Sequence, residues 1–304
     1  MSVYRNAVWF VKGLQEYTRS GYEAASQRFV TSDLEVDLSG RSFMITGANS
    51  GLGKRTALEV ATRGGTVHLL CRNQSRAEAA RQEIMELSKN QNVHVVDLSN
   101  ARGVWEFAQS FSESSSLHVL ALSRGCMVDQ RELTEDGLEK NFATNTLGVS
   151  SVTTALVPAL KRAQDPRVVT VSSGGMFTQK LNVDDLQFEK GTFDGTAAYA
   201  QNKRQQVILT ERWASQHKEI HFSSMHPGWA DNPGLQTSMP AFHAKMRSRL
   251  RTEAMGAAAA AAQQPSGLFF QDRRAVAAHL PLASSPQEEE QLLAALEFSL
   301  KFRP

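Results

Sequence analysis

Cysteine is scarce in this chain, and long hydrophobic runs are absent. Two cysteines, Cys71 and Cys126, occur in 304 residues, and neither belongs to a Cys-x-x-Cys pair or a His/Cys ligand spacing. This pattern indicates two reduced structural thiols and no metal site. No apolar run approaches the roughly 20 residues that span a bilayer, and the first residues lack the apolar core of a signal peptide. We therefore expect a cytoplasmic protein without a transmembrane segment.

A large excess of charge of one sign is also missing. The formal net charge is only +2, and the basic residues are scattered along the sequence, so we expect no nucleic-acid partner. Hydrophobic residues make up 41% of the chain and charged residues 21%. These fractions are typical of a folded globular protein with a sizeable core.

Residues 1–39 form an extension ahead of the first predicted strand. Charged residues separate apolar ones that recur at helical spacing, namely Val3, Ala7, Val11 and Leu14. This spacing predicts a short amphipathic helix. Two interpretations are open: the helix packs on the outside of the domain, or it makes a weak contact with a membrane surface, aided by Trp9 and Phe10.

From residue 42 onward, short apolar runs alternate with helical patterns. The runs are Phe43 to Thr46, Val67 to Leu70, Val93 to Val96, Val119 to Leu122, Val168 to Val171 and Ile220 to Met225. The alternation predicts βαβ units, and continuous apolar runs indicate parallel strands covered by helices on both faces. We expect one doubly wound α/β domain of three layers, α/β/α, over residues 40–304. Ser285 and Pro286 predict the start of a last helix.

Three glycines follow the first strand at the spacing of a dinucleotide-binding turn. Gly47 permits a tight turn, Gly51 lets backbone approach a pyrophosphate at a helix N-terminus, and Gly53 lets helix and strand pack closely. A predicted strand and a helical stretch, Lys54 to Arg63, flank the triplet as the motif requires. We therefore expect dinucleotide binding, with contacts from Thr46, Gly47, Asn49, Ser50, Gly51, Leu52 and Gly53.

A cation stands where NAD-binding sites place a carboxylate. The second strand ends in Leu70-Cys71-Arg72, which offers no acidic group to a ribose 2′-hydroxyl. A guanidinium suits the 2′-phosphate of NADP through charge-assisted hydrogen bonds, so NADPH is the expected cofactor. An arginine on a solvated loop is the alternative. Asp97 and Leu98, which end the third strand, are expected to meet the adenine, unless Asp97 only caps the next helix.

A tyrosine and a lysine open a later helical stretch. Tyr199 and Lys203 are four residues apart, which puts the phenol and the ammonium on one face of a helix. An adjacent ammonium favours the phenolate, so the pair makes a workable general acid and base. The fifth strand ends in Ser172 and Ser173, at the edge where open α/β sheets bind ligands.

Together these residues resemble the short-chain dehydrogenase/reductase family over residues 41 to about 272, and they fit its retinol-dehydrogenase-like branch. The resemblance implies a Rossmann-like fold and four catalytic residues. Ser173 would hydrogen-bond the substrate carbonyl, and Tyr199 would transfer the proton. Lys203 would orient the nicotinamide ribose and lower the pKa of Tyr199. Asn145 would be the fourth catalytic residue and would act through a water molecule.

The resemblance extends to three further places. Ser173, rather than Ser172, aligns with the active serine. Pro227, Gly228 and Trp229 resemble the family's Pro-Gly loop, whose backbone contacts the nicotinamide, although the threonine expected near Asn232 is absent. Gly125 matches a glycine after the fourth strand, and the insertion around Asp184, Asp185 and Leu186 is the expected substrate-side loop.

Two segments depart from the family pattern. Leu122, Ser123 and Arg124 replace an Asn-Asn-Ala sequence before Gly125. Because those asparagines hold the central strands together and line the cofactor, either the loop moves or cofactor affinity falls. The alanines of residues 257–262 replace a bulkier helix, and truncation of large core side chains costs roughly 2 to 5 kcal/mol each.

Three functions compete at this point. The first is an NADP(H)-dependent oxidoreductase that interconverts a carbonyl and an alcohol on a small, lipophilic substrate. The second is a pseudoenzyme that acts by binding, which the segment 122–124 favours. The third, a methyltransferase-like α/β protein, explains the glycines but leaves Tyr199 and Lys203 unused. His221 and His226 flank a strand and are expected to be structural, and assembly into a homo-oligomer stays open.

Overall fold

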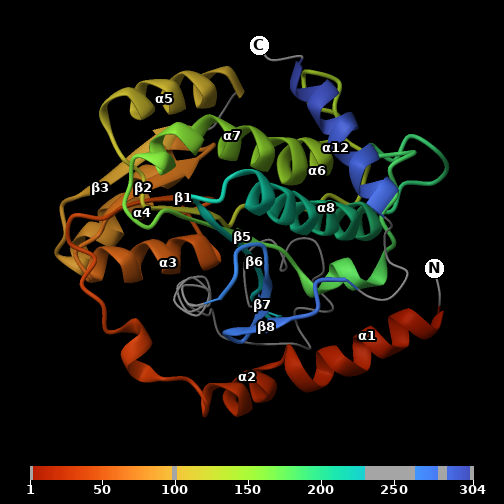
Figure 1. The fold of residues 1–304 in the computed structure, drawn as a ribbon, viewed down its shortest axis with the longest axis horizontal. Coiled ribbons are helices and arrows are strands. Elements are labelled where there is room, and N and C mark those ends of the chain that lie inside the picture. Colours follow the sequence, from red (N-terminus) through yellow and green to blue (C-terminus); the bar gives the residue numbers. More distant parts are fainter. Residues whose placement is uncertain (1–2, 98–100, 230–263, 280–285, 302–304) are drawn as a thin grey trace.

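A single twisted sheet forms the centre of the molecule (Figure 1). The structure, a computed structural model, describes residues 3–97, 101–229, 264–279 and 286–301. The sheet has eight strands in the order β3-β2-β1-β4-β5-β6-β7-β8. The strands are β1 Ser42–Thr46, β2 Thr66–Cys71, β3 Val93–Asp97, β4 Val119–Leu122, β5 Arg167–Val171, β6 His221–His226, β7 Phe269–Gln271 and β8 Arg274–Val276.

The six strands expected from the apolar runs all occur, within one or two residues of their predicted bounds, and all pair in parallel. The sequence patterns did not predict β7, which is parallel to β6, or β8, which is antiparallel to β7. Each has three residues. The turn between them uses two left-handed residues that are not glycine, Asp272 and Arg273, so the usual hairpin signal is missing.

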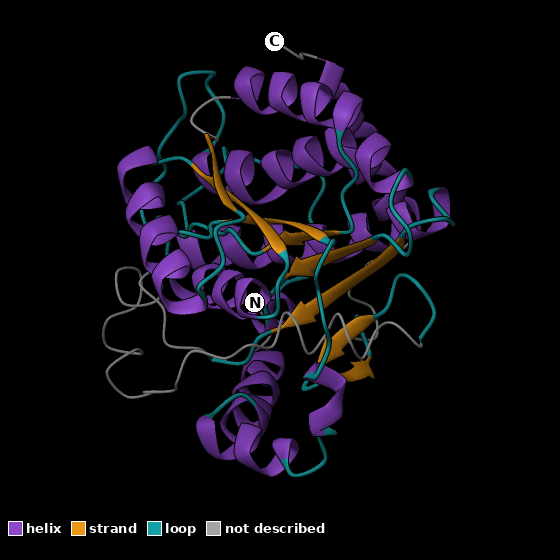
Figure 2. Ribbon diagram, turned by 90° about the vertical axis from the view of Figure 1, so that its left-hand side faces the viewer, coloured by secondary structure: helices purple, strands orange, loops and turns teal. Residues whose placement is uncertain are grey.

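Helices cover both faces of this sheet (Figure 2). They are α1 Val3–Glu16, α2 Arg19–Ser26, α3 Gly51–Thr62, α4 Gln74–Ser88, α5 Ala101–Ser114, α6 Lys140–Phe142, α7 Gly148–Lys161, α8 Gly195–Gln216 and α12 Pro286–Lys301. A π-helical segment, Ala143–Leu147, joins α6 to α7. Helix α12 begins at Pro286, as the sequence predicts. Among the described helices, none is long and apolar enough to cross a membrane.

Successive strand residues point to opposite faces and form two apolar cores. In β1, Ile45 packs in one core, with α3 residues such as Val60. Its neighbour Met44 packs in the other core, with α7 residues such as Leu156. Burial of a side chain of this size stabilises the fold by roughly 1.5 to 3 kcal/mol. The predicted three-layer, doubly wound architecture is confirmed.

The N-terminal extension packs against the domain through residues other than the apolar stripe predicted for its helix. The exposed fraction is 54% for Val11 and 42% for Leu14, whereas Tyr17 is fully buried. Helix α1 instead contacts Trp229 through Trp9, whose ring centroid lies 5.9 Å from that of Trp229. A Cβ atom at Gly13 would lie 2.5 Å from the Trp229 ring, so close approach of the helix requires glycine there. The domain boundary near residue 40 stays a prediction.

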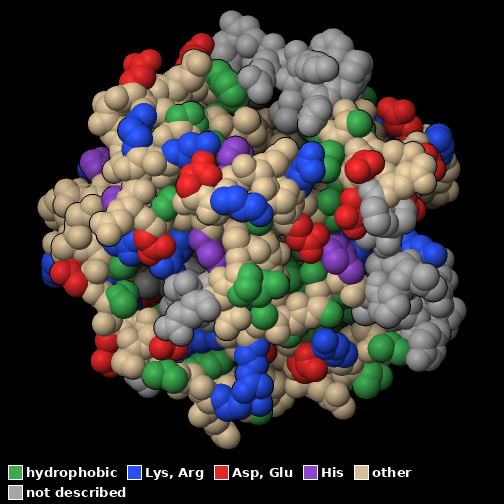
Figure 3. Space-filling view, in the orientation of Figure 1, with side chains coloured by type: hydrophobic (Ala, Val, Ile, Leu, Met, Phe, Trp, Pro, Cys, Tyr) green, Lys and Arg blue, Asp and Glu red, His purple; other side chains and the backbone are tan. Residues whose placement is uncertain are grey.

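Charged side chains of both signs lie beside one another across the face shown in Figure 3. This face is therefore not a surface of one sign. Side chains of opposite charge also form ion pairs within single helices of the molecule, such as Arg19 with Glu23 and Arg81 with Glu78.

Replacing Gly13 by leucine should undock α1. The new side chain overlaps the Trp229 ring, and overpacking of this kind costs about 1 to 3 kcal/mol. We expect a lower melting temperature and faster tryptic cleavage after Lys12. Val11→Ala alters only the exposed face and serves as the control. Equal cleavage rates in Gly13→Leu, Val11→Ala and the parent protein would contradict this docking.

Candidate active site

The carboxyl ends of the parallel strands bring the predicted site residues to one edge of the sheet. Thr46 lies beside Leu70 across β1 and β2, and Cys71 lies beside Asp97 across β2 and β3. Val171 lies beside Met225 across β5 and β6. Because all these strands run in the same direction, the loops that follow them gather at this edge.

Lys203 is the most deeply buried charged group of the candidate site. Asp194 caps the N-terminus of α8, and its carboxylate accepts from the backbone N–H groups of Thr196 and Ala197. Lys203 follows about two turns into the helix. It is 2% exposed, and its Nζ donates to the backbone oxygen of Val171 over 2.8 Å. Burial lowers the pKa of Lys203 to about 8, because a desolvated ammonium is less stable than a hydrated one.

Tyr199 lies one turn before Lys203, whose Nζ is 5.5 Å from the centroid of the phenol ring. Burial raises the pKa of Tyr199 to about 12, against the smaller lowering effect of a hydrogen bond with the Ser173 hydroxyl. The resemblance implied that Lys203 lowers this pKa. In the structure desolvation of the phenolate is the largest effect on this pKa, and it raises the pKa, so the phenol is protonated at neutral pH.

The two serines after β5 have different surroundings. Ser172 is buried, and its hydroxyl donates to the backbone oxygen of Lys203 over 2.7 Å. The Ser173 hydroxyl bonds to Tyr199 and accepts from the backbone N–H of Gly175. Ser172 therefore anchors α8 to the sheet, whereas Ser173 accompanies the phenol. The choice of Ser173 over Ser172 stays a prediction.

Asn145 holds the loop that follows β4. It lies in the π-helical segment and is fully buried. Its Nδ2 donates to the backbone oxygen of Cys126 over 2.8 Å, and its Oδ1 accepts from the backbone N–H of Cys126 over 2.9 Å. The oxygen and the nitrogen of the Asn145 amide therefore both bond to the backbone of Cys126. This pair of hydrogen bonds resembles the pair that two residues exchange between β-strands.

The glycine turn has the conformation that a dinucleotide requires. Gly47 and Gly51 have φ angles of +68° and +54°, which lie in the region that favours glycine. A Cβ atom at Gly53 would lie 2.6 Å from the backbone oxygen of Gly47, so α3 packs closely on the turn. Ser50 precedes α3 without making a side-chain cap, and the first N–H groups of a helix suit an anionic pyrophosphate. The residues present therefore fit the expected cofactor.

Two arginines flank this turn. Arg72 is exposed after β2. Arg124 donates its backbone N–H to the Thr46 hydroxyl over 3.0 Å, and its Cα and Cβ would lie 3.1 Å from a Cβ atom at Gly47. Burial first, and then the charge of Arg72, lower the pKa of Arg124 to about 10. The two cations therefore act on each other across the glycine turn.

The Pro-Gly loop after β6 contacts the N-terminal extension. Gly228 has a φ angle of +75°, and the backbone N–H of Trp229 donates to the backbone oxygen of Tyr17 over 2.8 Å. The Tyr17 ring lies edge-on to His226, with centroids 4.3 Å apart, and His226 accepts from the backbone N–H of Gly174. Tyr17 was missed in the sequence, although Trp9, Gly13 and Tyr17 recur at a spacing of four.

Several predicted residues lie outside the description. Leu98, Asn232 and the alanines of residues 257–262 fall outside the described residues, and of Asp97 only the backbone is described. Gly125 is exposed, and a Cβ atom there would lie 3.4 Å from the Nζ of Lys203.

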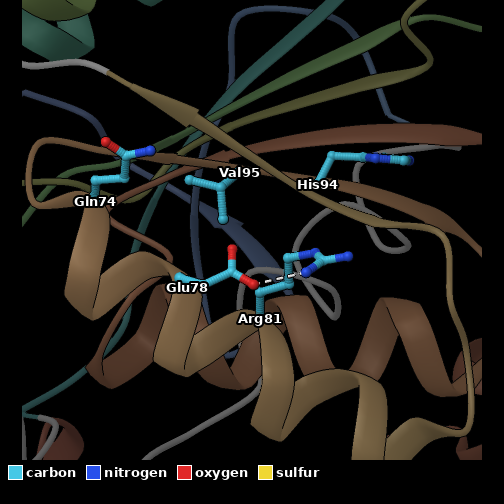
Figure 4. Close-up of a pocket in the computed structure, with 5 residues that line it drawn as sticks. All are labelled: Gln74, Glu78, Arg81, His94 and Val95. Atoms are coloured by element: carbon cyan, nitrogen blue, oxygen red, sulfur yellow. Dashed lines mark hydrogen bonds and ion pairs between the residues drawn. The ribbon is translucent and has the colours of Figure 1, made fainter.

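A cavity of about 470 Å³ lies elsewhere, between α4 and the edge strand β3 (Figure 4). Its lining is Gln74, Glu78, Arg81, His94 and Val95. Arg81 bonds to Glu78 and donates to the backbone oxygen of Val93. These polar groups cover the open edge of the sheet, and none of the predicted catalytic residues lines the cavity.

The sheet topology and the glycine turn are those of a dinucleotide-binding α/β protein. Residues 41–184 match the family model described as short chain dehydrogenase. The chain is 61% identical to dehydrogenase/reductase SDR family member 12 of Homo sapiens, over 98% of each chain. It is 33% identical to retinol dehydrogenase 13 of Homo sapiens, over 64% of this chain and 61% of the relative.

A solved structure shares the fold of this chain. A putative uncharacterized protein from Mycobacterium paratuberculosis matches with a TM-score of 0.63 and 26% identity, over 87% of this chain and 92% of that one. The chain belongs to the short-chain dehydrogenase/reductase family, so the predicted resemblance is confirmed. The methyltransferase-like alternative was wrong.

Asn145→Leu should destabilise the protein more than removal of a polar group beside it. The substitution leaves the part-buried N–H and C=O groups of Cys126 without the Asn145 amide, and loss of a hydrogen bond of this kind costs about 0.5 to 1.5 kcal/mol. Urea unfolding measures the loss. Thr153→Val is the matched control in α7, because among the described residues the Thr153 hydroxyl donates to the backbone oxygen of Val149 in its own helix. Equal losses in the two variants would contradict the proposed clamp.

Proposed function

We propose that this chain is an NADP(H)-dependent oxidoreductase that interconverts a carbonyl and an alcohol on a lipophilic substrate. The observation that carries the proposal is the contact of the Ser173 hydroxyl with the Tyr199 phenol, with the Lys203 ammonium 5.5 Å from the ring. A relative at 33% identity is named for retinol, a lipophilic alcohol, which supports that class of substrate.

In the reducing direction, each residue has a chemical task. Ser173 donates a hydrogen bond to the substrate carbonyl oxygen, and Tyr199 delivers a proton to that oxygen as it becomes an alcohol. When bound, the reduced cofactor supplies the hydride that the carbonyl carbon receives. Lys203 stabilises the phenolate left on Tyr199, which then regains a proton from solvent. The high pKa of Tyr199 keeps this acid protonated before the reaction.

The preference for NADPH rests on Arg72, with Arg124 as a second cation at the same turn. Two guanidinium groups that repel each other are both stabilised by a phosphate dianion. In the part of the chain that the structure describes, no ion pair is recorded for either arginine. A 2′-phosphate supplies the missing countercharge, whereas the 2′-hydroxyl of NAD does not.

The departure at Leu122-Ser123-Arg124 does not by itself favour a pseudoenzyme. Thr46 holds the backbone of Arg124, and Asn145 holds Cys126 two residues later. The loop after β4 is therefore anchored on both sides of Gly125 without the family's asparagines. This anchoring supports a working site over one that acts only by binding.

The exposed apolar residues of the extension support a proposal for the location of the protein. We propose a cytoplasmic protein whose α1 rests weakly on a membrane surface, where a lipophilic substrate partitions. Four apolar side chains of α1 are at least 42% exposed, namely Val8, Phe10, Val11 and Leu14. Such a stripe suits the interface between lipid headgroups and acyl chains, and pairing of two stripes in a homo-oligomer is the other way to cover it.

Tyr199→Phe should abolish turnover and leave NADPH affinity nearly unchanged, because it removes only the transferable proton. The measurement is NADPH oxidation with a panel of lipophilic aldehydes and ketones, beside calorimetric titration with NADPH. Tyr22→Phe, in the extension, is the control. Near-normal turnover by Tyr199→Phe, on a substrate that the parent reduces, would falsify the assigned role.

Arg72→Ala should remove much of the preference for NADPH over NADH. Loss of a charge-assisted hydrogen bond costs about 1.5 to 3 kcal/mol, or roughly 10- to 150-fold in affinity. Fluorescence titrations with both nucleotides measure the ratio, and Arg212→Ala, at the far end of α8, is the control. If the parent protein bound NADPH and NADH equally, the proposed role of Arg72 would be wrong.

A further inference from the structure

One side-chain amide joins two residues of the candidate site. Gln206 lies one turn after Lys203 on α8 and is fully buried. Its Nε2 donates to the backbone oxygen of Asn145 over 2.6 Å. Its Oε1 accepts from the Nζ of Lys203 over 3.1 Å. Gln206 therefore links the π-helical segment to the buried ammonium.

The placement of this amide is costly unless both of its ends are used. Transfer of an amide from water to an apolar interior is unfavourable when no hydrogen bond replaces those to water. Here both polar atoms of Gln206 are occupied, and each meets a group that needs a partner: a carbonyl and an ammonium N–H. A hydrophobic residue would pack equally well but would leave both groups unsatisfied.

We propose that Gln206 is a positioning residue for Lys203, and that its amide fixes the place of the ammonium relative to the backbone of Asn145. This inference rests on the proposed function, in which Lys203 orients the ribose and stabilises the phenolate. It assigns Gln206 no contact with substrate or cofactor.

The bridge fixes the direction of the ammonium. Lys203 has three N–H donors. The backbone oxygen of Val171 takes one and Gln206 takes another, which leaves one for the ribose. Both acceptors are neutral dipoles that favour the charged amine against the effect of burial. The other titratable groups that act here are Tyr199, on the same helix, and Cys126, from the loop after β4.

The Gln206 amide also limits proton transfer between Lys203 and Asn145. A water molecule can accept a proton on one side and donate one on the other, but a carboxamide holds its two N–H bonds and accepts only at oxygen. Protons therefore do not pass from Lys203 to Asn145 through Gln206. Tyr199 regains its proton by a route that avoids this amide.

A neighbouring glutamine provides a matched control. Gln205 is 1% exposed, and its Oε1 accepts from the Thr146 hydroxyl over 2.7 Å. It therefore joins α8 to the same π-helical segment as Gln206 does. Gln205 differs from Gln206 in its relation to Lys203. Among the described residues, Lys203 Nζ bonds to Val171 and Gln206 and not to Gln205.

The test is the ionisation of Lys203 in the unliganded full chain, followed by NMR with 13C-labelled lysine, with its signal assigned from Lys203→Arg. In Gln206→Met, a substitution of similar shape without the amide, we expect the pKa of Lys203 to fall by about one unit, since one acceptor is lost. In Gln206→Glu we expect it to rise, because a carboxylate faces the ammonium. Gln205→Met should leave it unchanged.

The proposal is overturned if Gln206→Met and Gln205→Met move the pKa of Lys203 equally, or if Gln206→Glu does not raise it. Should Gln206→Met fail to fold, Gln206→Glu carries the test, because it keeps the length and an acceptor oxygen. The titration uses neither substrate nor cofactor. An inactive chain would therefore overturn the proposed function without deciding this result, and an unchanged pKa would overturn the bridge without deciding the activity.

Discussion

The burial of the Lys203 ammonium is the constraint around which the carboxyl edge of the sheet is organised. A cation that is 2% exposed needs acceptors on the protein, because water no longer provides them. The last residue of β5, Val171, supplies one acceptor, and Gln206 supplies the other. Ser172 then bonds to the backbone of Lys203 itself. These bonds hold α8 at a fixed height above the sheet and so determine where the Tyr199 phenol lies.

The same edge is stiffened from two further directions. On one side, Asn145 pairs with the backbone of Cys126, so the loop after β4 stays in place although Leu122, Ser123 and Arg124 depart from the family pattern. On the other side, Tyr17 bonds to Trp229 in the Pro-Gly loop. The N-terminal extension therefore packs against the Pro-Gly loop. A substitution in α1 that moves this helix is expected to move the loop, which is expected to face the nicotinamide.

Charge is distributed unevenly over this edge. Arg72 and Arg124 flank the glycine turn, and Lys203 lies at the other end of the candidate site. These cations suit a ligand that carries phosphates at one end and a reacting ring at the other. Among the described residues at the other end, Ser173 and Tyr199 offer hydroxyl groups to a substrate. This division agrees with a lipophilic substrate beside an anionic cofactor.

Local patterns in the sequence were sufficient to predict the first six parallel strands and several of the helices, because strand and helix periodicities depend on neighbouring residues. Short motifs were sufficient to predict the glycine turn and the family. The strands β7 and β8 were not predicted. The motifs also selected Ser173, Tyr199 and Lys203, although that assignment stays a proposal. Contacts between distant segments could not be predicted this way. The direction of the Tyr199 pKa depends on how deeply the fold buries the phenol. The hydrogen bond from Gln206 to the backbone oxygen of Asn145 joins residues 61 positions apart. The hydrogen bond between Trp229 and Tyr17 spans most of the chain. Only the tertiary structure decides such contacts, because burial and partners are properties of the assembled fold.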